Sequence, residues 1–160
     1  MGGLDLFGCL WLFFVYSFFG WIAETCFCVL KYRKFMNRGM LNSPLCIVYG
    51  IAAVIITIGF PELFDEIPIL FLGCAGVSTL LEWFTAKILE KLDHKKWWDY
   101  SSKRWNLDGY ICLQYSIVWG ILGVLSVKFV TPVLMKLYHM VPSFMMQIAV
   151  WALLGVLIVD

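Results

Sequence analysis

Five apolar runs, each close to the length needed to cross a bilayer, dominate this 160-residue sequence. A helix needs about 20 mostly apolar residues to cross the hydrocarbon core. The runs cover residues 4–30, 45–60, 67–89, 109–129 and 141–159. Backbone groups inside a bilayer must be bonded within the segment, and the runs show no alternation of polar and apolar residues, so we expect helices. The sequence predicts an all-α integral membrane protein, a single transmembrane domain over residues 1–160.

Composition supports a lipid-facing surface. Hydrophobic residues make up 62% of the chain and charged residues 14%, against about 45–50% and about 25% in soluble domains. This balance excludes an ordinary soluble domain and places the chain in a cell membrane.

The basic residues predict the orientation of the helices. Four lie in the connection 31–44, six lie at the end of the third run and in the connection 90–108, and only Lys128 and Lys136 lie on the other side. The positive-inside rule puts connections 31–44 and 90–108 in the cytoplasm. The N-terminus is then outside and, with five spans, the C-terminus is cytoplasmic.

The long connection 90–108 mixes aromatic and basic side chains. Its aromatic residues, which we assign to the membrane interface, are Trp97, Trp98, Tyr100 and Trp105. Such a mixture favours contact with the inner headgroup layer, so membrane lipids are predicted partners. Nucleic acid is not a predicted partner, because the basic patch is small and fixed at the membrane.

The two hairpins with predicted cytoplasmic connections resemble each other. Each has a lone glutamate late in its first helix, Glu24 and Glu82. Each has a glycine before its second helix and another eleven residues later: Gly39 and Gly50 in one hairpin, Gly109 and Gly120 in the other. Aromatic residues, Tyr49 and Trp119, precede the later glycine. The pattern indicates two parallel helical-hairpin repeats and one extra helix.

Three polar side chains lie at one depth in the predicted inner leaflet. Counting from the cytoplasmic ends at about 1.5 Å per residue, Glu24 is about 9 Å deep, Glu82 about 10 Å and Gln114 about 8 Å. Ionisable side chains inside spans cost about 2.5–3.5 kcal/mol and usually face the bundle interior. We therefore expect a polar pocket that opens to the cytoplasm and binds a ligand or ion.

The expected rim of this pocket consists of polar residues in the two cytoplasmic connections. They are Asn37, Arg38, Asn42, Asp99 and Asn106. A structural interpretation stays open, in which Glu24 and Glu82 only pair with Arg38, Lys87 or each other and hold the bundle together.

Motifs of catalysis are absent from the sequence. It contains no P-loop, no nucleophile elbow and no zinc-protease motif. We therefore predict no catalytic residue, no metal and no cofactor, and any ATP-driven activity would need a separate ATPase subunit.

Several motifs together resemble the ABC-transporter type IV (CmpB-like) membrane family. They are Tyr16-Ser-Phe-Phe-Gly20-Trp-Ile-Ala-Glu24, Asn37-Arg38-Gly39, Pro44, Tyr49-Gly50, Glu82, Trp98-Asp99-Tyr100-Ser101, Asn106-Leu107, Gly109, Ile111-Cys112-Leu113 and Trp119-Gly120. The chain departs from the family pattern at Ser43, Ile47 and Tyr110, where the pattern has Gly, Pro and Arg. The resemblance implies a membrane permease.

Three functions remain open at this point. The first is a transport component built around Glu24 and Glu82, as a homo-oligomer or with a partner. The second is a non-catalytic membrane subunit or regulator that docks a partner or anionic lipid through connection 90–108. The third is a membrane-embedded lipid-processing enzyme, in which the two carboxylates act as acid and base. The sequence does not specify a substrate or an energy source.

Overall fold

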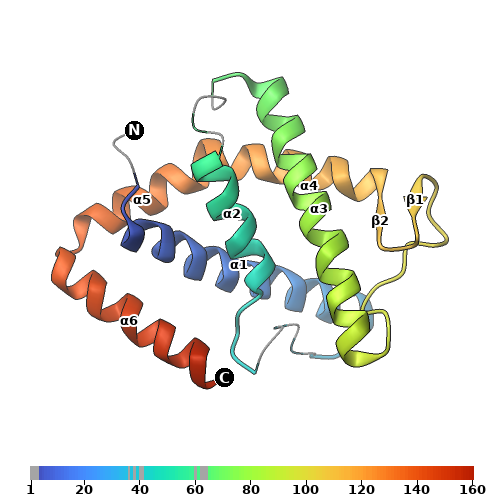
Figure 1. The fold of residues 1–160 in the computed structure, drawn as a ribbon, viewed down its shortest axis with the longest axis horizontal. Helices are drawn as coiled ribbons and strands as arrows, with labels where there is room; N and C mark the ends of the chain where they lie inside the picture. Colours follow the sequence, from blue (N-terminus) through green and yellow to red (C-terminus); the bar gives the residue numbers. More distant parts are fainter. Residues whose placement is uncertain (1–3, 36, 38, 40–41, 60, 62–64) are drawn as a thin grey trace. The chain divides into compact units, whose positions relative to one another are not determined.

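The computed structural model describes residues 4–35, 37, 39, 42–59, 61 and 65–160. These residues form α1 (Leu6–Tyr32), α2 (Ile47–Gly59), α3 (Ile67–Asp93), α4 (Leu113–Leu125), a π-helical turn η2 (Ser126–Val130), α5 (Thr131–Met140) and α6 (Ser143–Val159) (Figure 1). One short antiparallel pair, β1 (Asn106–Leu107) and β2 (Ile111–Cys112), precedes α4. The all-helical membrane fold predicted from the apolar runs is confirmed.

Three helical segments are long and apolar enough to cross a membrane: Leu6–Lys31, Ile67–Asp93 and Leu113–Met140. The chain is therefore a multi-pass membrane protein. The other two apolar helices are shorter, about 20 Å for the 13 residues of α2 and about 26 Å for the 17 residues of α6. Large hydrophobic side chains such as Leu72 and Phe129 are two-thirds exposed, as expected of a surface that faces lipid.

Local chemistry explains where these helices begin. The side chain of Asp5 caps α1 by accepting a hydrogen bond from the backbone N–H of Gly8 at 2.9 Å. Pro68 lies in the first turn of α3, where the missing N–H costs no helical hydrogen bond. Arg33 and His94 follow α1 and α3 in the left-handed conformation that often ends a helix.

The fourth predicted span, residues 109–129, differs from the structure at both ends. Its helix begins only at Leu113, because residues 106–112 form the β1–β2 hairpin. It then continues through η2 and α5 to Met140, where we expected a connection. Pro132 has no N–H to bond the carbonyl of Lys128, and its ring would clash with that carbonyl in a regular α-helix. The π-helical turn over Ser126–Val130 widens the helix at this point, so the helix passes the proline.

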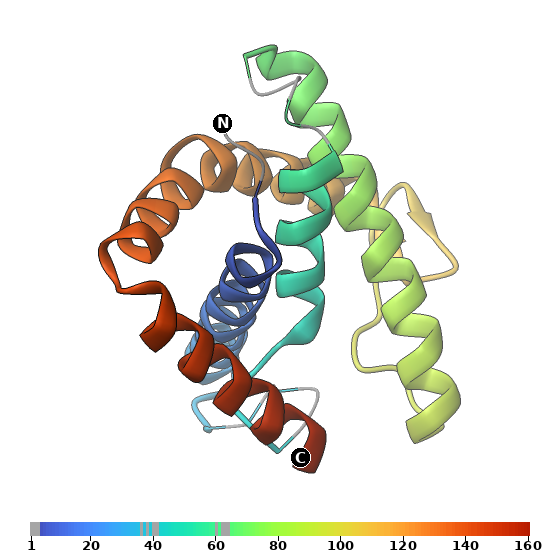
Figure 2. The same ribbon diagram turned by 60° about the vertical axis from the view of Figure 1, so that its left-hand side comes forward.

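The chain forms two compact units, which we call unit 1 (residues 1–54 and 131–160) and unit 2 (residues 55–130). In unit 1, α6 lies beside α1 (Figure 2). The buried core of unit 1 contains Phe14, Leu45, Met146 and Val150. In unit 2, α3 packs on α4. The buried core of unit 2 contains Ile56, Leu70, Cys74 and Val127.

Contacts at the helix ends fix the direction of α6 within unit 1. Asp5, just before α1, accepts a hydrogen bond from the hydroxyl of Tyr138 at 2.9 Å. Asp160, just after α6, accepts one from the backbone N–H of Ser43 at 2.8 Å. The helix α6 therefore starts near the beginning of α1 and ends near Ser43.

Candidate functional site

The carboxylate of Glu24 in α1 is held by a tyrosine from α2. The hydroxyl of Tyr49 donates a hydrogen bond to Oε1 of Glu24 at 2.7 Å. Gly20, one turn before Glu24, makes room for the tyrosine ring, since a Cβ at this position would lie 2.4 Å from Cγ of Tyr49. The missing side chain at Gly20 therefore lets α2 bring its hydroxyl to the carboxylate. We call the pair Glu24 and Tyr49 the unit 1 clasp.

The carboxylate of Glu82 in α3 is held by two aromatic donors. The indole N–H of Trp119 in α4 donates to Oε2 at 3.2 Å, and the hydroxyl of Tyr100 donates to Oε1 at 3.1 Å. Tyr100 comes from the connection after α3 and stacks on Tyr115, with ring centroids 4.7 Å apart. We call Glu82, Trp119 and Tyr100 the unit 2 clasp.

The environment of Tyr100 keeps it a neutral hydrogen-bond donor. Burial raises the pKa of the Tyr100 hydroxyl well above its ordinary value of 10, and the charge of Glu82 and the hydrogen bond to it raise the pKa further. The hydroxyl therefore stays protonated beyond the pH at which an ordinary tyrosine ionises, and it donates a hydrogen bond to the carboxylate.

The two clasps have the same register within their hairpins. Glu24 and Glu82 are 58 residues apart, as are Phe13 and Phe71. Tyr49 and Trp119 are 70 residues apart, as are the glycines that follow them. A Cβ at Gly50 would meet Phe13 and Ser17, and a Cβ at Gly120 would meet the equivalent residues Phe71 and Ala75. The described contacts within each unit therefore follow the repeat that the sequence indicates.

In the sequence, Tyr49 and Trp119 stand out as members of this repeat and of the family motifs, and Tyr100 as an interfacial aromatic in a family motif. Their role as donors to the glutamates could not be seen, since the hydrogen bonds join residues 25, 37 and 18 positions apart. A signal that could have indicated this role is the position of Tyr49 and Trp119 immediately before Gly50 and Gly120, where two helices approach closely.

Two of the three asparagines predicted for the pocket rim, Asn37 and Asn106, bond backbone groups of their own connections. Oδ1 of Asn37 accepts hydrogen bonds from the indole of Trp21 at 2.6 Å and the N–H of Gly39 at 3.0 Å. Oδ1 of Asn106 accepts from the N–H of Gly109 at 3.1 Å, and its Nδ2 donates to the carbonyl of Lys103 at 2.7 Å. Each asparagine therefore shapes the turn before a second helix.

The other predicted pocket residues have separate surroundings. Asp99 is exposed and accepts hydrogen bonds from Oγ of Ser101 at 2.6 Å and its N–H at 2.9 Å, which lower the pKa of Asp99. Gln114 is exposed in the first turn of α4. Asn42 donates through Nδ2 to the carbonyl of Asp160 at 3.4 Å. Arg38 lies outside the described residues. Glu24 belongs to unit 1 and Glu82 to unit 2, so a pocket shared by both stays a prediction.

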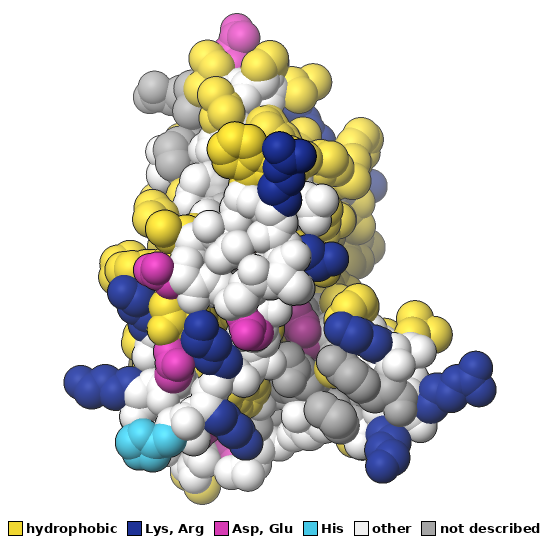
Figure 3. Space-filling model, turned by 90° about the vertical axis from the view of Figure 1, so that its right-hand side faces the viewer, with side chains coloured by type: hydrophobic (Ala, Val, Ile, Leu, Met, Phe, Trp, Pro, Cys, Tyr) yellow, Lys and Arg dark blue, Asp and Glu magenta, His cyan; other side chains and the backbone are white. Residues whose placement is uncertain are grey.

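Lysine side chains near the end of α3 lie over aromatic rings. Nζ of Lys87 is 3.9 Å from the centroid of the Trp83 ring, and Nζ of Lys96 is 4.6 Å from that of Tyr110. These are cation–π distances. Figure 3 shows most of the lysine and arginine side chains of this face in dark blue in the lower half of the picture, and many hydrophobic side chains in yellow in the upper half.

The four aromatic residues assigned to the interface divide into two groups. The indole of Trp97 donates to Asp93, that of Trp98 donates to the carbonyl of Tyr110 at 2.9 Å, and Tyr100 bonds to Glu82. These three side chains tie the connection to its own hairpin. Trp105 is 71% exposed and has a φ of 59°, a rare backbone conformation for an aromatic residue.

Within the part of the chain that the structure describes, no three His, Cys, Asp or Glu side chains come together as metal ligands. Each clasp contains one carboxylate, Glu24 in unit 1 and Glu82 in unit 2. An ionised carboxylate is an acceptor only, so it binds cations or groups that donate hydrogen bonds.

One family model matches the chain over residues 11–160, nearly its whole length; its description is "Putative ABC-transporter type IV". Neither a curated protein nor a solved structure matches.

Proposed function

The chain belongs to the ABC-transporter type IV family, and from this membership we propose that it works as a transport subunit in which Glu24 and Glu82 contact the transported solute. The observation that carries the proposal is the pair of clasps. Each places a carboxylate within a membrane-spanning helix and orients it with an aromatic donor from the next helix. A carboxylate oxygen can accept more than one hydrogen bond, so a carboxylate held by an aromatic donor can also bind a ligand.

The carboxylates select the class of solute. A group that contacts Glu24 or Glu82 must carry a positive charge or donate hydrogen bonds, which points to small cations and amine-bearing solutes. We propose that the solute meets the glutamates from the cytoplasmic side, on which connections 31–44 and 90–108 lie. The hydrogen bond between Ser43 and Asp160 supports the matching assignment of the C-terminus to that side.

The sequence has no P-loop, so ATP-driven transport would require a separate ATPase subunit. We propose that the path is completed by a second copy of the chain or by such a partner.

Proteoliposomes test the proposal with a panel of alkali cations and small amines as probes. Wild-type protein, reconstituted alone or with an ATPase subunit, is expected to take up at least one probe. Glu24→Gln and Glu82→Gln remove the charge but keep the shape, and each is expected to lower uptake by about 10- to 100-fold, the worth of one charge-assisted hydrogen bond.

Glu66→Gln is the matched control. Glu66 is exposed before α3 and makes no side-chain capping bond, so uptake should be unchanged. Circular dichroism and gel filtration would establish that all variants fold. Wild-type flux in both clasp variants would refute the role of the glutamates.

A second candidate function is docking of an ATPase or regulatory subunit by the connection after α3. Trp105 favours it, because an exposed tryptophan beside an arginine is typical of the residues that dominate protein interfaces. The Arg104 guanidinium lies 5.9 Å from the Trp105 ring. Trp105→Ala should prevent stoichiometric co-purification of the subunit, and the control Leu107→Ala, an exposed position on β1, should not. Equal recovery with both variants would exclude docking through Trp105.

A further inference from the structure

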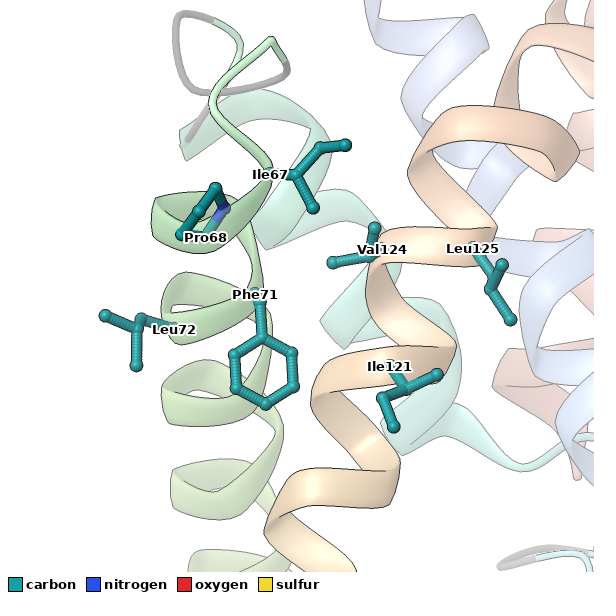
Figure 4. Close-up of a pocket in the computed structure, with 7 residues that line it drawn as sticks. All are labelled: Ile67, Pro68, Phe71, Leu72, Ile121, Val124 and Leu125. Carbon is teal, nitrogen blue, oxygen red and sulfur yellow. The ribbon is translucent and has the colours of Figure 1, made fainter.

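An apolar groove runs between the first turns of α3 and the last turns of α4, both in unit 2 (Figure 4). Its walls are Ile67, Phe71 and Leu72 of α3 and Ile121, Val124 and Leu125 of α4. Its volume is about 500 Å³, within the range of sites that bind small organic molecules. Because Leu72 lies only about 8 Å along α3 from Ile67, the groove belongs to the outermost part of the apolar span.

The residues of the groove wall favour a hydrocarbon chain over a protein helix. Helices that pack inside membranes meet through small residues such as Gly, Ala, Ser and Thr. None of the lining residues is of these types. The small residues on this side of α4 are already used, because Gly120 and Gly123 approach Phe71 and Cys74 of α3. The remaining surface is formed by branched and aromatic side chains, against which a flexible acyl chain can pack.

Apolar contact alone would not retain one lipid, since the bilayer is as apolar as the groove. Selection has to come from the headgroup, and charged residues are available at one end of the groove. Nζ of Lys128 lies 3.5 Å from Oδ1 of Asp65. Lys128 follows Leu125 by three residues, and Asp65 precedes Ile67 by two. The Asp65 side chain is fully exposed and that of Lys128 is 28% exposed, so both charges can be reached from the headgroup layer.

The helix is irregular where Lys128 is placed. Lys128 is the central residue of η2, the π-helical turn that accommodates Pro132. Turns of this kind occur frequently at functional sites, because they change the direction in which a side chain points. The turn lies directly after the groove residues Val124 and Leu125.

We propose that this groove binds one phospholipid with a primary amine in its headgroup. The acyl chain packs between α3 and α4, the phosphate contacts the ammonium of Lys128, and the headgroup ammonium contacts the carboxylate of Asp65. One positive and one negative side chain match the two charges of such a headgroup. A primary ammonium can donate hydrogen bonds to Asp65, whereas a choline headgroup has no N–H to donate. This inference is independent of any transport activity.

Native mass spectrometry of protein extracted from vesicles tests the proposal. The vesicles contain equal amounts of phosphatidylethanolamine, phosphatidylcholine and phosphatidylglycerol. We expect one phosphatidylethanolamine to remain bound to the wild type, with a preference of about tenfold over the other two lipids. Asp65→Ala, which leaves no side-chain acceptor, should abolish the preference over phosphatidylcholine, and Lys128→Gln should lower retention of all three phospholipids.

Ile121→Trp fills the groove and should abolish retention of the lipid. Leu80→Trp is its control, because Leu80 is 59% exposed on α3 outside the groove. Both variants must insert and remain monodisperse, which gel filtration establishes. Equal retention in these two variants, or equal retention of all headgroups by the wild type, would overturn the proposal. A dimer that Ile121→Trp separates into monomers would also overturn it, because a second copy would then occupy the groove.

Discussion

The close approach of α1 and α2 at Gly50 gives the sharpest test of the unit 1 clasp. In Gly50→Ala, the new methyl group would lie 2.3 Å from Oγ of Ser17 and 2.4 Å from the carbonyl oxygen of Phe13. Overpacking of this kind costs about 1–3 kcal/mol. The upper value applies here, because the Phe13 oxygen is backbone and can move only with α1. Alanine regains about 1 kcal/mol of helix propensity over glycine, so we expect a net loss of about 2 kcal/mol.

Gly76→Ala is the matched control for this change. Gly76 lies in α3, and a Cβ there would meet nothing within 4 Å. It should therefore stabilise the protein by up to about 1 kcal/mol. The free energy of unfolding in mixed detergent micelles, followed by circular dichroism, should thus differ by about 3 kcal/mol between the two variants. A difference below about 0.5 kcal/mol, the ordinary scatter of surface substitutions, would refute the packing of α1 on α2.

A double variant separates the two clashes at Gly50. Ser17→Ala removes the hydroxyl but leaves the 2.4 Å contact with the Phe13 carbonyl. The combination with Gly50→Ala should therefore remain nearly as unstable as Gly50→Ala alone. Recovery of wild-type stability would show that the side chain of Ser17, and not the backbone of α1, limits the approach.

Three further predictions concern the connection between α3 and α4 and the orientation of the chain. Gly109→Ala should raise the hydrogen-exchange rate of residues 99–110. Gly109 has a φ of 74°, and the Cβ of an alanine at this position would lie 2.5 Å from Oγ of Ser101. Unchanged exchange rates would contradict the described turn. The raised pKa of Tyr100 in the folded protein means that its contribution to stability is complete below about pH 10, where the unfolded tyrosine ionises, and is lost as the pH rises further. Tyr100→Phe should remove this loss of stability in unfolding experiments between pH 9 and pH 11, taken as about one unit either side of the ordinary pKa. An unaltered pH dependence of the stability would argue against the described contact of Tyr100. In spheroplasts, an impermeant maleimide should label the introduced thiol of Asp65→Cys, and it should label that of Lys95→Cys only after the membrane is opened. The reverse result would invert the predicted orientation.

Hydrophobicity alone located most of the helices, because a helix that crosses the bilayer needs a continuous run of apolar residues, which can be seen directly in the sequence. The predicted runs 4–30, 67–89 and 141–159 lie within a few residues of α1, α3 and α6. The fourth run failed at both ends for a different reason. Its start depends on backbone pairing between Asn106 and Cys112, and its end depends on how the helix accommodates Pro132. Both are properties of hydrogen bonding that apolar length does not report.

The candidate site could be predicted only in part for a similar physical reason. The cost of placing a charge in a membrane singles out Glu24 and Glu82 wherever they occur in an apolar run. This cost does not reveal which groups bond the two carboxylates, since the donors come from other helices and from a connection. Asn37 and Asn106 pose the same problem. Their polarity predicts a place on the rim of the pocket, which stays a prediction, but it does not show that their amide groups bond the backbone of their own turns.

The contacts that the two hairpins share also show where they differ chemically. Tyr49 and Trp119 occupy equivalent positions and both donate to a glutamate. A tyrosine hydroxyl can accept a hydrogen bond while it donates one, whereas an indole N–H only donates. The donor to Glu24 is therefore a hydroxyl that can also accept, whereas the helical donor to Glu82, the indole of Trp119, cannot. Tyr100 adds a second oriented donor to Glu82, and its raised pKa opposes loss of its proton. The two hairpins therefore hold carboxylates at equivalent positions with different donors, one hydroxyl in unit 1 and an indole with a hydroxyl in unit 2, a difference that an exact duplication could not supply.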